Sequence, residues 1–342
     1  MTNLWWWAGF NAVVLTLLAI DLGVFHRRAH RVSVREAAAW SAVWVTLSLS
    51  FGAGVYFVLG SDKGVEFLTG YLIEYALSVD NIFVFVLIFS YFRIPAEYQH
   101  RVLFWGILGA LVFRGTMIAV GVALIARFHW VLYLFGAFLV YTGIRMALQN
   151  REETYDPESN PTLRFVRHLF PVTTRYHGQK FFVRERHGAG TRLVATPLFI
   201  ALALVETTDI IFATDSIPAI FAVTRDPFIV YSSNVCAVLG LRALYFLLAG
   251  IVDRFHYLQL GLSVVLVFIG GKMLLEDIYD IPTLVSLGVV ASVLSIAGVA
   301  SLLWPARHRP GVPPLAHMLS HSHDRHDDES GQPSADARRD GQ

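Results

Sequence analysis

Apolar residues fill long, nearly uncharged stretches of this chain, separated by short polar turns and one longer polar connection. A helix rises 1.5 Å per residue, so about 20 apolar residues are needed to cross a bilayer. Nine stretches of about this length predict transmembrane helices at residues 4–25, 37–59, 65–91, 101–126, 129–149, 196–222, 228–252, 257–276 and 282–304. The pattern predicts an all-α, polytopic helical membrane protein with about nine transmembrane helices.

Positive charges in the loops predict how the chain is oriented. Cytoplasmic loops carry an excess of Lys and Arg. Two connections fit: the first holds Arg27, Arg28, Arg31 and Arg35, and the second holds Arg151, Arg164, Arg167, Arg175, Lys180, Arg184, Arg186 and Arg192. Three turns on the other side of the membrane hold one positive residue each, namely Lys63, Arg127 and Arg225. We therefore expect the N-terminus outside and the C-terminus in the cytoplasm. The first span lacks the features of a cleaved signal peptide and is expected to be retained.

Composition agrees with a membrane protein and narrows its chemistry. The chain is 55% hydrophobic and 15% charged, whereas soluble domains carry about 25% charged residues. The net charge of +1 gives no support for nucleic-acid binding. Cys236 is the only cysteine, so no intrachain disulfide can form, and its apolar surroundings indicate a buried thiol.

Loops and spans together divide the chain into six segments. These are two N-terminal helices (1–60), a first three-helix unit (61–149), a polar cytoplasmic linker (150–195), a second three-helix unit (196–277), a final helix (278–305) and a disordered, His- and Asp-rich cytoplasmic tail (306–342). The tail's histidine run at 321–326 is expected to be solvated, with weak metal binding as the alternative.

The two three-helix units resemble one another. Shifting the sequence by 135 lays Glu74, Asp80 and Asn81 on Asp209, Asp215 and Ser216. A shift of 128 lays Arg114 on Arg242. A shift of 127 lays residues 128–130 on 255–257, and Gly143-Ile144-Arg145-Met146 on Gly270-Gly271-Lys272-Met273. Three spans are an odd number, so the second unit enters the membrane from the opposite side. This predicts an inverted repeat, the plan of many secondary transporters, with a site near the midplane.

Ionisable residues inside the spans are the candidate chemistry. A carboxylate at the centre of a spanning helix costs roughly 2.5–3.5 kcal/mol on insertion scales, so such residues are functional candidates by default. They are Glu74, Asp80, Arg114, Glu206, Asp209, Asp215 and Arg242, with Asp21 near the inner end of the first span. Six acids against two arginines favour a cation over an oxyanion. Carboxylate, carbonyl and amide oxygens suit Mn²⁺, Mg²⁺ and Ca²⁺.

We expect Asp80, Asn81, Asp215 and Ser216 to be the central metal ligands. Glu74 and Asp209 are expected beside them, and Glu206 to act as a ligand or as a proton carrier. Arg114 and Arg242 are expected to balance the charge of the carboxylates. For each acid, a structural polar contact is the alternative interpretation.

Helix geometry limits this hypothesis. Residues six apart lie about 9 Å apart along a helix and about 120° apart around it. Glu74 and Asp80 therefore cannot chelate one ion on a straight helix. Pro218 removes the hydrogen bond to the carbonyl of Thr214, which predicts a broken helix there with a free carbonyl oxygen. A single ion would draw ligands from both units, with Asp80 and Asp215 as the first pair to test.

Four segments also resemble a known family. Leu72–Asn81 and Leu204–Ile220 resemble the two signatures of the TerC/Alx integral membrane family. Asp21–Arg27 resembles the end of the family's first span, and Tyr231–Asn234 with Leu239–Phe246 resembles a further block. The resemblance covers about residues 10–305. Within the family, the chain resembles the Alx branch of bacterial inner-membrane proteins. It implies a multi-pass protein of that membrane. Members are associated with manganese export and tellurium resistance, and the Alx branch has been described as a membrane-bound redox modulator.

These observations predict a transporter rather than an enzyme. We expect a secondary exporter of divalent metal ions, manganese first, driven by proton exchange at the intramembrane carboxylates and without a bound cofactor. Lipid, the metal ion and protons are the expected partners, and the oligomeric state is left open. Three alternatives remain: a tellurium-resistance component acting on an oxyanion, a redox modulator, and a scaffold that recruits partners through 150–195.

Overall fold

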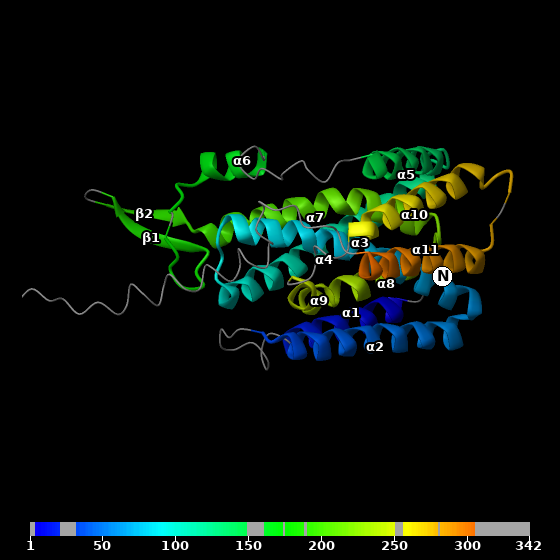
Figure 1. The fold of residues 1–342 in the computed structure, drawn as a ribbon, viewed down its shortest axis with the longest axis horizontal. Helices are drawn as coiled ribbons and strands as arrows, with labels where there is room; N and C mark the ends of the chain where they lie inside the picture. The colour runs from blue at the N-terminus through cyan, green and yellow to red at the C-terminus, as the bar shows by residue number, and fades with distance from the viewer. Residues whose placement is uncertain are drawn as a thin grey trace, which may run out of the picture.

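The computed structural model describes residues 4–20, 32–148, 161–173, 175–187, 190–249, 256–279 and 281–304. They form a bundle of long helices with one small β-hairpin at its end (Figure 1). The elements are α1 (Leu4–Ile20), α2 (Val34–Leu59), α3 (Ser61–Tyr91), α4 (Ala96–Arg127), α5 (Val131–Leu148), α6 (Pro161–Leu169), β1 (Phe182–His187), β2 (Gly190–Ala195), α7 (Pro197–Phe221), α8 (Pro227–Leu239), α9 (Leu241–Leu248), α10 (His256–Leu275) and α11 (Thr283–Leu303).

The all-α membrane architecture predicted from the sequence is confirmed. Eight spans of the described chain are long and apolar enough to cross a membrane, with α8 and α9 counted together as Pro227–Leu248. The first apolar helix, α1, is shorter at 17 residues. The rest of its predicted span, residues 21–25, lies outside the described residues.

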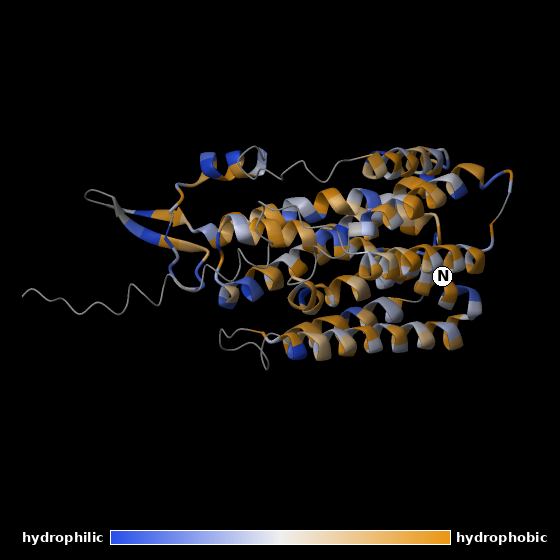
Figure 2. Cartoon of the chain, viewed as in Figure 1, coloured by the Kyte–Doolittle hydropathy of each residue, from blue (hydrophilic) through white to orange (hydrophobic). Residues whose placement is uncertain are grey.

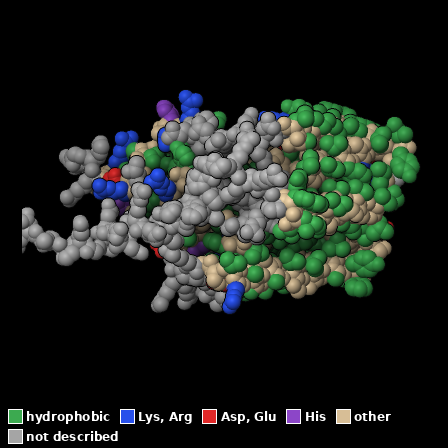
Figure 3. Space-filling view, in the orientation of Figure 1, with side chains coloured by type: hydrophobic (Ala, Val, Ile, Leu, Met, Phe, Trp, Pro, Cys, Tyr) green, Lys and Arg blue, Asp and Glu red, His purple; other side chains and the backbone are tan. Residues whose placement is uncertain are grey.

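Polarity is segregated along the bundle. Hydropathy colouring shows mostly apolar helices, whereas the hairpin is mixed, with hydrophilic residues in its outer part and hydrophobic ones next to the bundle (Figure 2). On the face shown in Figure 3, apolar side chains cover the end away from the hairpin, and most of the visible Lys and Arg side chains gather at the hairpin end. We use "hairpin end" and "far end" for these two ends below.

Helices begin where the sequence supplies suitable caps. Ser33 accepts a hydrogen bond from the backbone N–H of Glu36 at 3.2 Å and so caps α2. Asp226 accepts one from the N–H of Phe228 at 3.0 Å and caps α8. Proline stands at the first position of α7 and α8, where its missing N–H has no intrahelical partner to lose.

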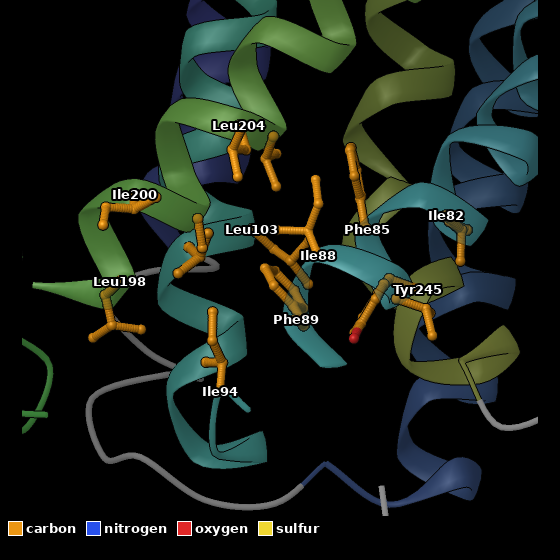
Figure 4. Packing of buried hydrophobic residues seen from close by; sticks show 14 of the residues in the cluster. Ile82, Phe85, Ile88, Phe89, Ile94, Leu103, Leu198, Ile200, Leu204 and Tyr245 are labelled. Carbon is orange, nitrogen blue, oxygen red and sulfur yellow. The ribbon is translucent and has the colours of Figure 1, made fainter. Parts of the chain in front are cut away.

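The centre of the bundle is built around α3 and α7. α3 packs against α2, α7, α8, α9 and α11, and α7 also packs against α4 and α6. Toward the hairpin end, buried side chains of these helices interlock, among them Phe85, Phe89, Leu103, Leu204 and Tyr245 (Figure 4). Between helices in lipid, such contacts stabilise mainly by close packing, because lipid is as apolar as the side chains.

The connection predicted to be a polar linker contains a short helix and a hairpin among its described residues. α6 buries Leu163 and Val166 in the cluster shared with α7. β1 and β2 form an antiparallel hairpin, and the ring of Phe182 lies 4.4 Å from that of Phe199 at the start of α7. Tyr176 donates a hydrogen bond to the carbonyl of Phe92 at 2.5 Å. We call residues 161–195 the cap.

Helices α5 and α10 pack against each other with reciprocal contacts. A Cβ added to Gly143 would lie 2.9 Å from the carbonyl oxygen of Ser263 and 3.0 Å from the nitrogen of Val267. A Cβ added to Gly270 would lie 2.6 Å from the oxygen of Gly136 and 2.9 Å from the nitrogen of Val140.

The same 127-residue shift converts one set of contacts into the other. It carries Gly136, Val140 and Gly143 onto Ser263, Val267 and Gly270. Contacts that run in opposite directions along the two helices make the pair antiparallel. The pair therefore has a local two-fold relation, as an inverted repeat requires. Extension of that relation to the whole three-helix units stays a prediction.

The helix break is not where the sequence predicted it. α7 runs without interruption through Pro218 to Phe221. The proline stands within the last turn, so a missing N–H there leaves most of the helix intact. The interruption falls instead at Gly240, between α8 and α9. It divides the span that carries Arg242.

Candidate functional site

Arg114 of α4 joins the two acidic segments at the centre of the bundle. Its Nε and Nη2 donate to Asp209 Oδ2 and Oδ1 of α7 at 2.9 and 2.8 Å. Its Nη1 donates to Glu74 Oε1 of α3 and lies 3.5 Å from Ser216 Oγ. The fork geometry of the guanidinium matches a carboxylate and makes the Asp209 contact bidentate. Four residues predicted for the site therefore meet in one group, which we call the Arg114 cluster.

The cluster is closed off from its surroundings. Arg114 is 2% exposed, Glu74 0%, Asp209 3% and Ser216 1%. Two carboxylates face one guanidinium, so one negative charge is in excess when both acids are ionised. Glu74 Oε2 is buried and has no hydrogen-bond partner among the described residues. In such low-dielectric surroundings an uncompensated charge is costly, and a proton or a cation would relieve it.

Small residues let α4 and α7 approach closely enough to form the cluster. A Cβ on Gly106 would lie 3.1 Å from Val205 Cγ1, and one on Gly121 would lie 2.6 Å from Phe221 Cε2. Residue numbers of the contacting pairs increase in the same direction along both helices, so α4 and α7 are parallel. Glycine at membrane helix interfaces permits this close approach of backbones.

Glu206 lies one turn before Asp209, directly against α4. A Cβ on Gly109 would fall 1.9 Å from Glu206 Oε1, so only glycine leaves room for this carboxylate. Glu206 is near enough to Asp209 for the two charges to interact. Its Oε2 is buried and has no hydrogen-bond partner among the described residues. Accepting a proton would remove the charge whose burial costs free energy.

The repeat does not duplicate Glu206. The 135-residue shift lays it on Tyr71, and the 128-residue shift lays Gly109 on Ala237. Tyr71 and Ala237 belong to one buried cluster of the bundle. The same position therefore holds an acid in one unit and a phenol in the other, which leaves one extra carboxylate in the centre.

The remaining predicted ligands lie along the same two helices. Asp215 stands one residue before Ser216 and is partly buried, and its Oδ1 has no hydrogen-bond partner in the part of the chain that the structure describes. Asp80 is partly buried and Asn81 is buried, one to two turns beyond Glu74 on α3. Within the described chain, no group of three or more His, Cys, Asp or Glu side chains is gathered closely enough to hold a metal. The assignment of Asp80, Asn81, Asp215 and Ser216 as metal ligands stays a prediction.

Two cations complete the charge pattern. Arg242, the predicted counterpart of Arg114, is buried on α9, which packs against α2, α3 and α4. Arg145, near the end of α5, adds a longer-range positive charge toward Asp215 without forming an ion pair with it in the described part of the chain. Sequence reasoning missed that role because Arg145 lies at the edge of its span. The signal was the alignment of Arg145 with Lys272 in the repeat.

Fold and charges together define a multi-pass helical membrane protein with ionisable groups at its centre. The integral membrane protein TerC family model matches residues 59–309, and this chain belongs to that family. It is 56% identical over 304 residues to an uncharacterized membrane protein, STKORF319, of Myxococcus xanthus, covering 89% of this chain and 93% of that one.

Other relatives cover similar lengths. The chain is 51% identical over 311 residues to Alx of Escherichia coli K12, named as a candidate membrane-bound redox modulator, covering 88% and 95% of the two chains. It is 42% identical over 297 residues to an uncharacterized membrane protein of Rickettsia bellii, covering 87% and 97%. No solved structure matches it.

Proposed function

We propose that this protein is a secondary transporter that exports divalent metal ions, manganese first, from the cytoplasm in exchange for protons. One observation carries the proposal: the Arg114 cluster and Glu206 place more carboxylates than cations at the buried centre of a membrane protein. Intramembrane acids of this kind mark ion and proton pathways. Oxygen ligands favour hard cations such as Mn²⁺.

Arg114 is the resident counter-charge of this site. It pairs with both Asp209 and Glu74 and so balances one of their two negative charges. The transported ion is bound by oxygens of Asp80, Asn81, Asp215 and Ser216 once the two acidic helices bring them together. Glu74 and Asp209 adjust the charge around it.

Glu206 is the proton carrier. A carboxylate binds a proton or a metal but not readily both, so metal affinity falls as the site is protonated. Glu206 is near enough to Asp209 for their charges to interact. It has no counterpart acid in the other three-helix unit. One such group supplies one coupled proton for each passage of the ion.

A redox role is the second candidate, since the relatives named Alx carry that description. Cys236 is the only cysteine of the sequence and is buried. A dithiol–disulfide cycle within one chain is therefore impossible. Cells lacking the protein should show altered manganese content if it exports metal, and an altered thiol redox state without a metal change if it modulates redox.

We propose that the protein lies in the inner membrane with its cap and C-terminus in the cytoplasm. Most of the Lys and Arg side chains visible in Figure 3 gather at the hairpin end, and positive charge favours the cytoplasmic side. Labelling of single cysteines by an impermeant thiol reagent tests this. A cysteine in the cap should react only after the membrane is opened.

Transport itself is tested with the full-length protein in proteoliposomes. Mn²⁺ flux should depend on an imposed pH gradient and should be lost in an Asp80→Asn/Asp215→Asn double variant. Asp62→Asn is the matched control, because Asp62 is exposed in the first turn of α3. Wild-type flux from the double variant would overturn the proposal.

A further inference from the structure

Asn234 of α8 is completely buried, and neither polar atom of its side chain has a hydrogen-bond partner among the described residues. An amide offers one acceptor oxygen and two N–H donors. Buried polar groups are nearly always paired, because burying one without a partner costs free energy. Asn234 ends the segment Tyr231–Asn234, which the ion site proposed above does not include. A bound ion or water molecule is the kind of partner that would satisfy this amide.

Asn234 faces α4 and α7. Val230, one turn before it on the same face of α8, belongs to a small buried cluster with Ile118 of α4 and Ile217 of α7. α4 is parallel to α7, and α8 returns across the bundle as the next span of the chain, so α8 is antiparallel to both. The next turn of α8 therefore meets the turn of α4 that precedes Ile118. That turn carries Arg114, four residues before Ile118.

α3 approaches α8 at nearly the same level. A Cβ on Gly70 would lie 2.8 Å from Oγ of Ser233, the residue before Asn234. Glu74 follows Gly70 by one turn on the same face of α3, and helical side chains lean back toward the preceding turn. Its Oε1 accepts from Arg114. Its Oε2 is buried and has no hydrogen-bond partner in the part of the chain that the structure describes. Two buried polar side chains with unpaired atoms therefore border the Arg114 cluster from α3 and α8.

We propose that Asn234 Oδ1, Glu74 Oε2 and Ser216 Oγ bind a divalent cation where α3, α7 and α8 meet. This rests on the proposed transport function and adds an amide oxygen from a third helix to its site. Ser216 Oγ lies 3.5 Å from the guanidinium nitrogen that binds Glu74, so these two side chains already share one neighbour. Carboxylate and amide oxygens suit hard cations such as Mn²⁺, Mg²⁺ and Ca²⁺.

The charge around this site suits a divalent ion. Glu74, Asp209 and Glu206 carry three negative charges when ionised, and Arg114 carries one positive charge. A divalent cation balances the remaining two, and buried charges are tolerated only when they are balanced. Protons restore the balance when the ion leaves, because protons and metal ions compete for carboxylates. Asn234 is neutral, so it adds a ligand oxygen without changing this balance.

A variant of the same shape tests the site without adding charge. Asn234→Leu keeps the branched side chain and removes both polar atoms. Asn11→Leu is the matched control, because the Asn11 amide donates to the carbonyl of Trp7 at 2.9 Å and accepts from the hydroxyl of Tyr231 at 2.7 Å. The midpoint of thermal unfolding of the full-length protein in detergent is measured over a range of Mn²⁺ concentrations, since an ion that binds the folded state raises it.

The two variants should respond in opposite ways. Asn234→Leu should weaken the apparent Mn²⁺ affinity at least tenfold, while its midpoint without metal stays at or above that of the wild type. Asn11→Leu should lower the midpoint and leave the Mn²⁺ affinity unchanged. The inference is overturned if Asn234→Leu binds Mn²⁺ as the wild type does, or if it loses stability as Asn11→Leu does, since the amide then serves the packing of α8. Mn²⁺ without effect on the wild type overturns it as well.

Flux in proteoliposomes separates this inference from the transport function. Mn²⁺ flux that persists at the wild-type rate in Asn234→Leu overturns the site and leaves the transporter intact. Mn²⁺ binding that depends on Asn234, in a protein that shows no flux, supports the site and overturns the transport function instead.

Discussion

Arg114 and Asp209 form a bidentate ion pair across α4 and α7, at 2.8 and 2.9 Å, with both side chains almost completely buried. The pair joins two segments 95 residues apart in the chain. Glu74 completes it from α3. Three helices are therefore fixed to one another by a single guanidinium, and the polar centre of the protein is also a structural joint.

Arg114→Gln should destabilise the protein strongly. It leaves two buried carboxylates without a cation, and breaking a buried ion pair by removing one partner costs about 3–5 kcal/mol. The midpoint of thermal unfolding in detergent measures the effect. A triple variant, Arg114→Met/Asp209→Asn/Glu74→Gln, should recover much of the loss because it removes the uncompensated charges together. Equal loss in both proteins would show that the charges are not the cause.

Gly109→Ala should abolish most proton-coupled flux while the protein still folds. The new Cβ would occupy the space of Glu206 Oε1, 1.9 Å away. The flexible end of the glutamate can turn aside, so the fold survives but the carboxylate leaves its place beside Asp209. Flux under a pH gradient is the measurement. Gly54→Ala is the control, since nothing lies within 4 Å of a Cβ there; if both variants transported equally, Glu206 would have no coupling role.

Gly143→Ala and Gly270→Ala should destabilise the α5–α10 pair by similar amounts. Their added Cβ atoms meet backbone at 2.9 and 2.6 Å, and backbone cannot swing away as a side chain can. Overpacking of this kind costs about 1–3 kcal/mol. Thermal unfolding measures it, and Gly271→Ala, with open space around its Cβ, should leave stability almost unchanged. A large difference between the first two variants would contradict the two-fold relation of the pair.

Much of the fold was predictable from the sequence because lipid imposes a simple rule. A helix must be long and apolar to span, so span number and approximate position follow from composition. The central helices are longer than their predicted spans: α3 begins at Ser61 and α4 begins at Ala96. Polar residues at helix ends reach past the apolar core, where hydropathy gives no signal.

The candidate site was predictable in content but not in pairing. Glu74 and Asp209 were identified as buried acids, and Arg114 as their counter-charge. That one guanidinium joins both acids depends on how α4 crosses α3 and α7, which hydropathy does not encode. Gly109 and Arg145 were overlooked for the same reason, because each acts on a residue of another helix. The helix break predicted at Pro218 was wrong because a proline in the last turn of a helix leaves the preceding turns intact.

Tyr176 should hold the cap to the membrane bundle. Its hydroxyl donates to the carbonyl of Phe92, at the turn between α3 and α4. Tyr176→Phe removes one hydrogen bond, worth about 1 kcal/mol, and leaves the ring in place. Tryptic cleavage within 161–195 should accelerate severalfold.

The dependence of this contact on pH follows from the same hydroxyl. Burial raises the pKa of Tyr176 from 10.0 to about 12. The folded protein keeps the proton where the unfolded chain would release it. The stabilisation is therefore complete below about pH 10 and is lost as the pH rises through about 12. Hydrogen exchange of the cap should be as well protected at pH 8 as at pH 6 once intrinsic rates are corrected. Protection that falls between those values would show that another group, and not Tyr176, fastens the cap.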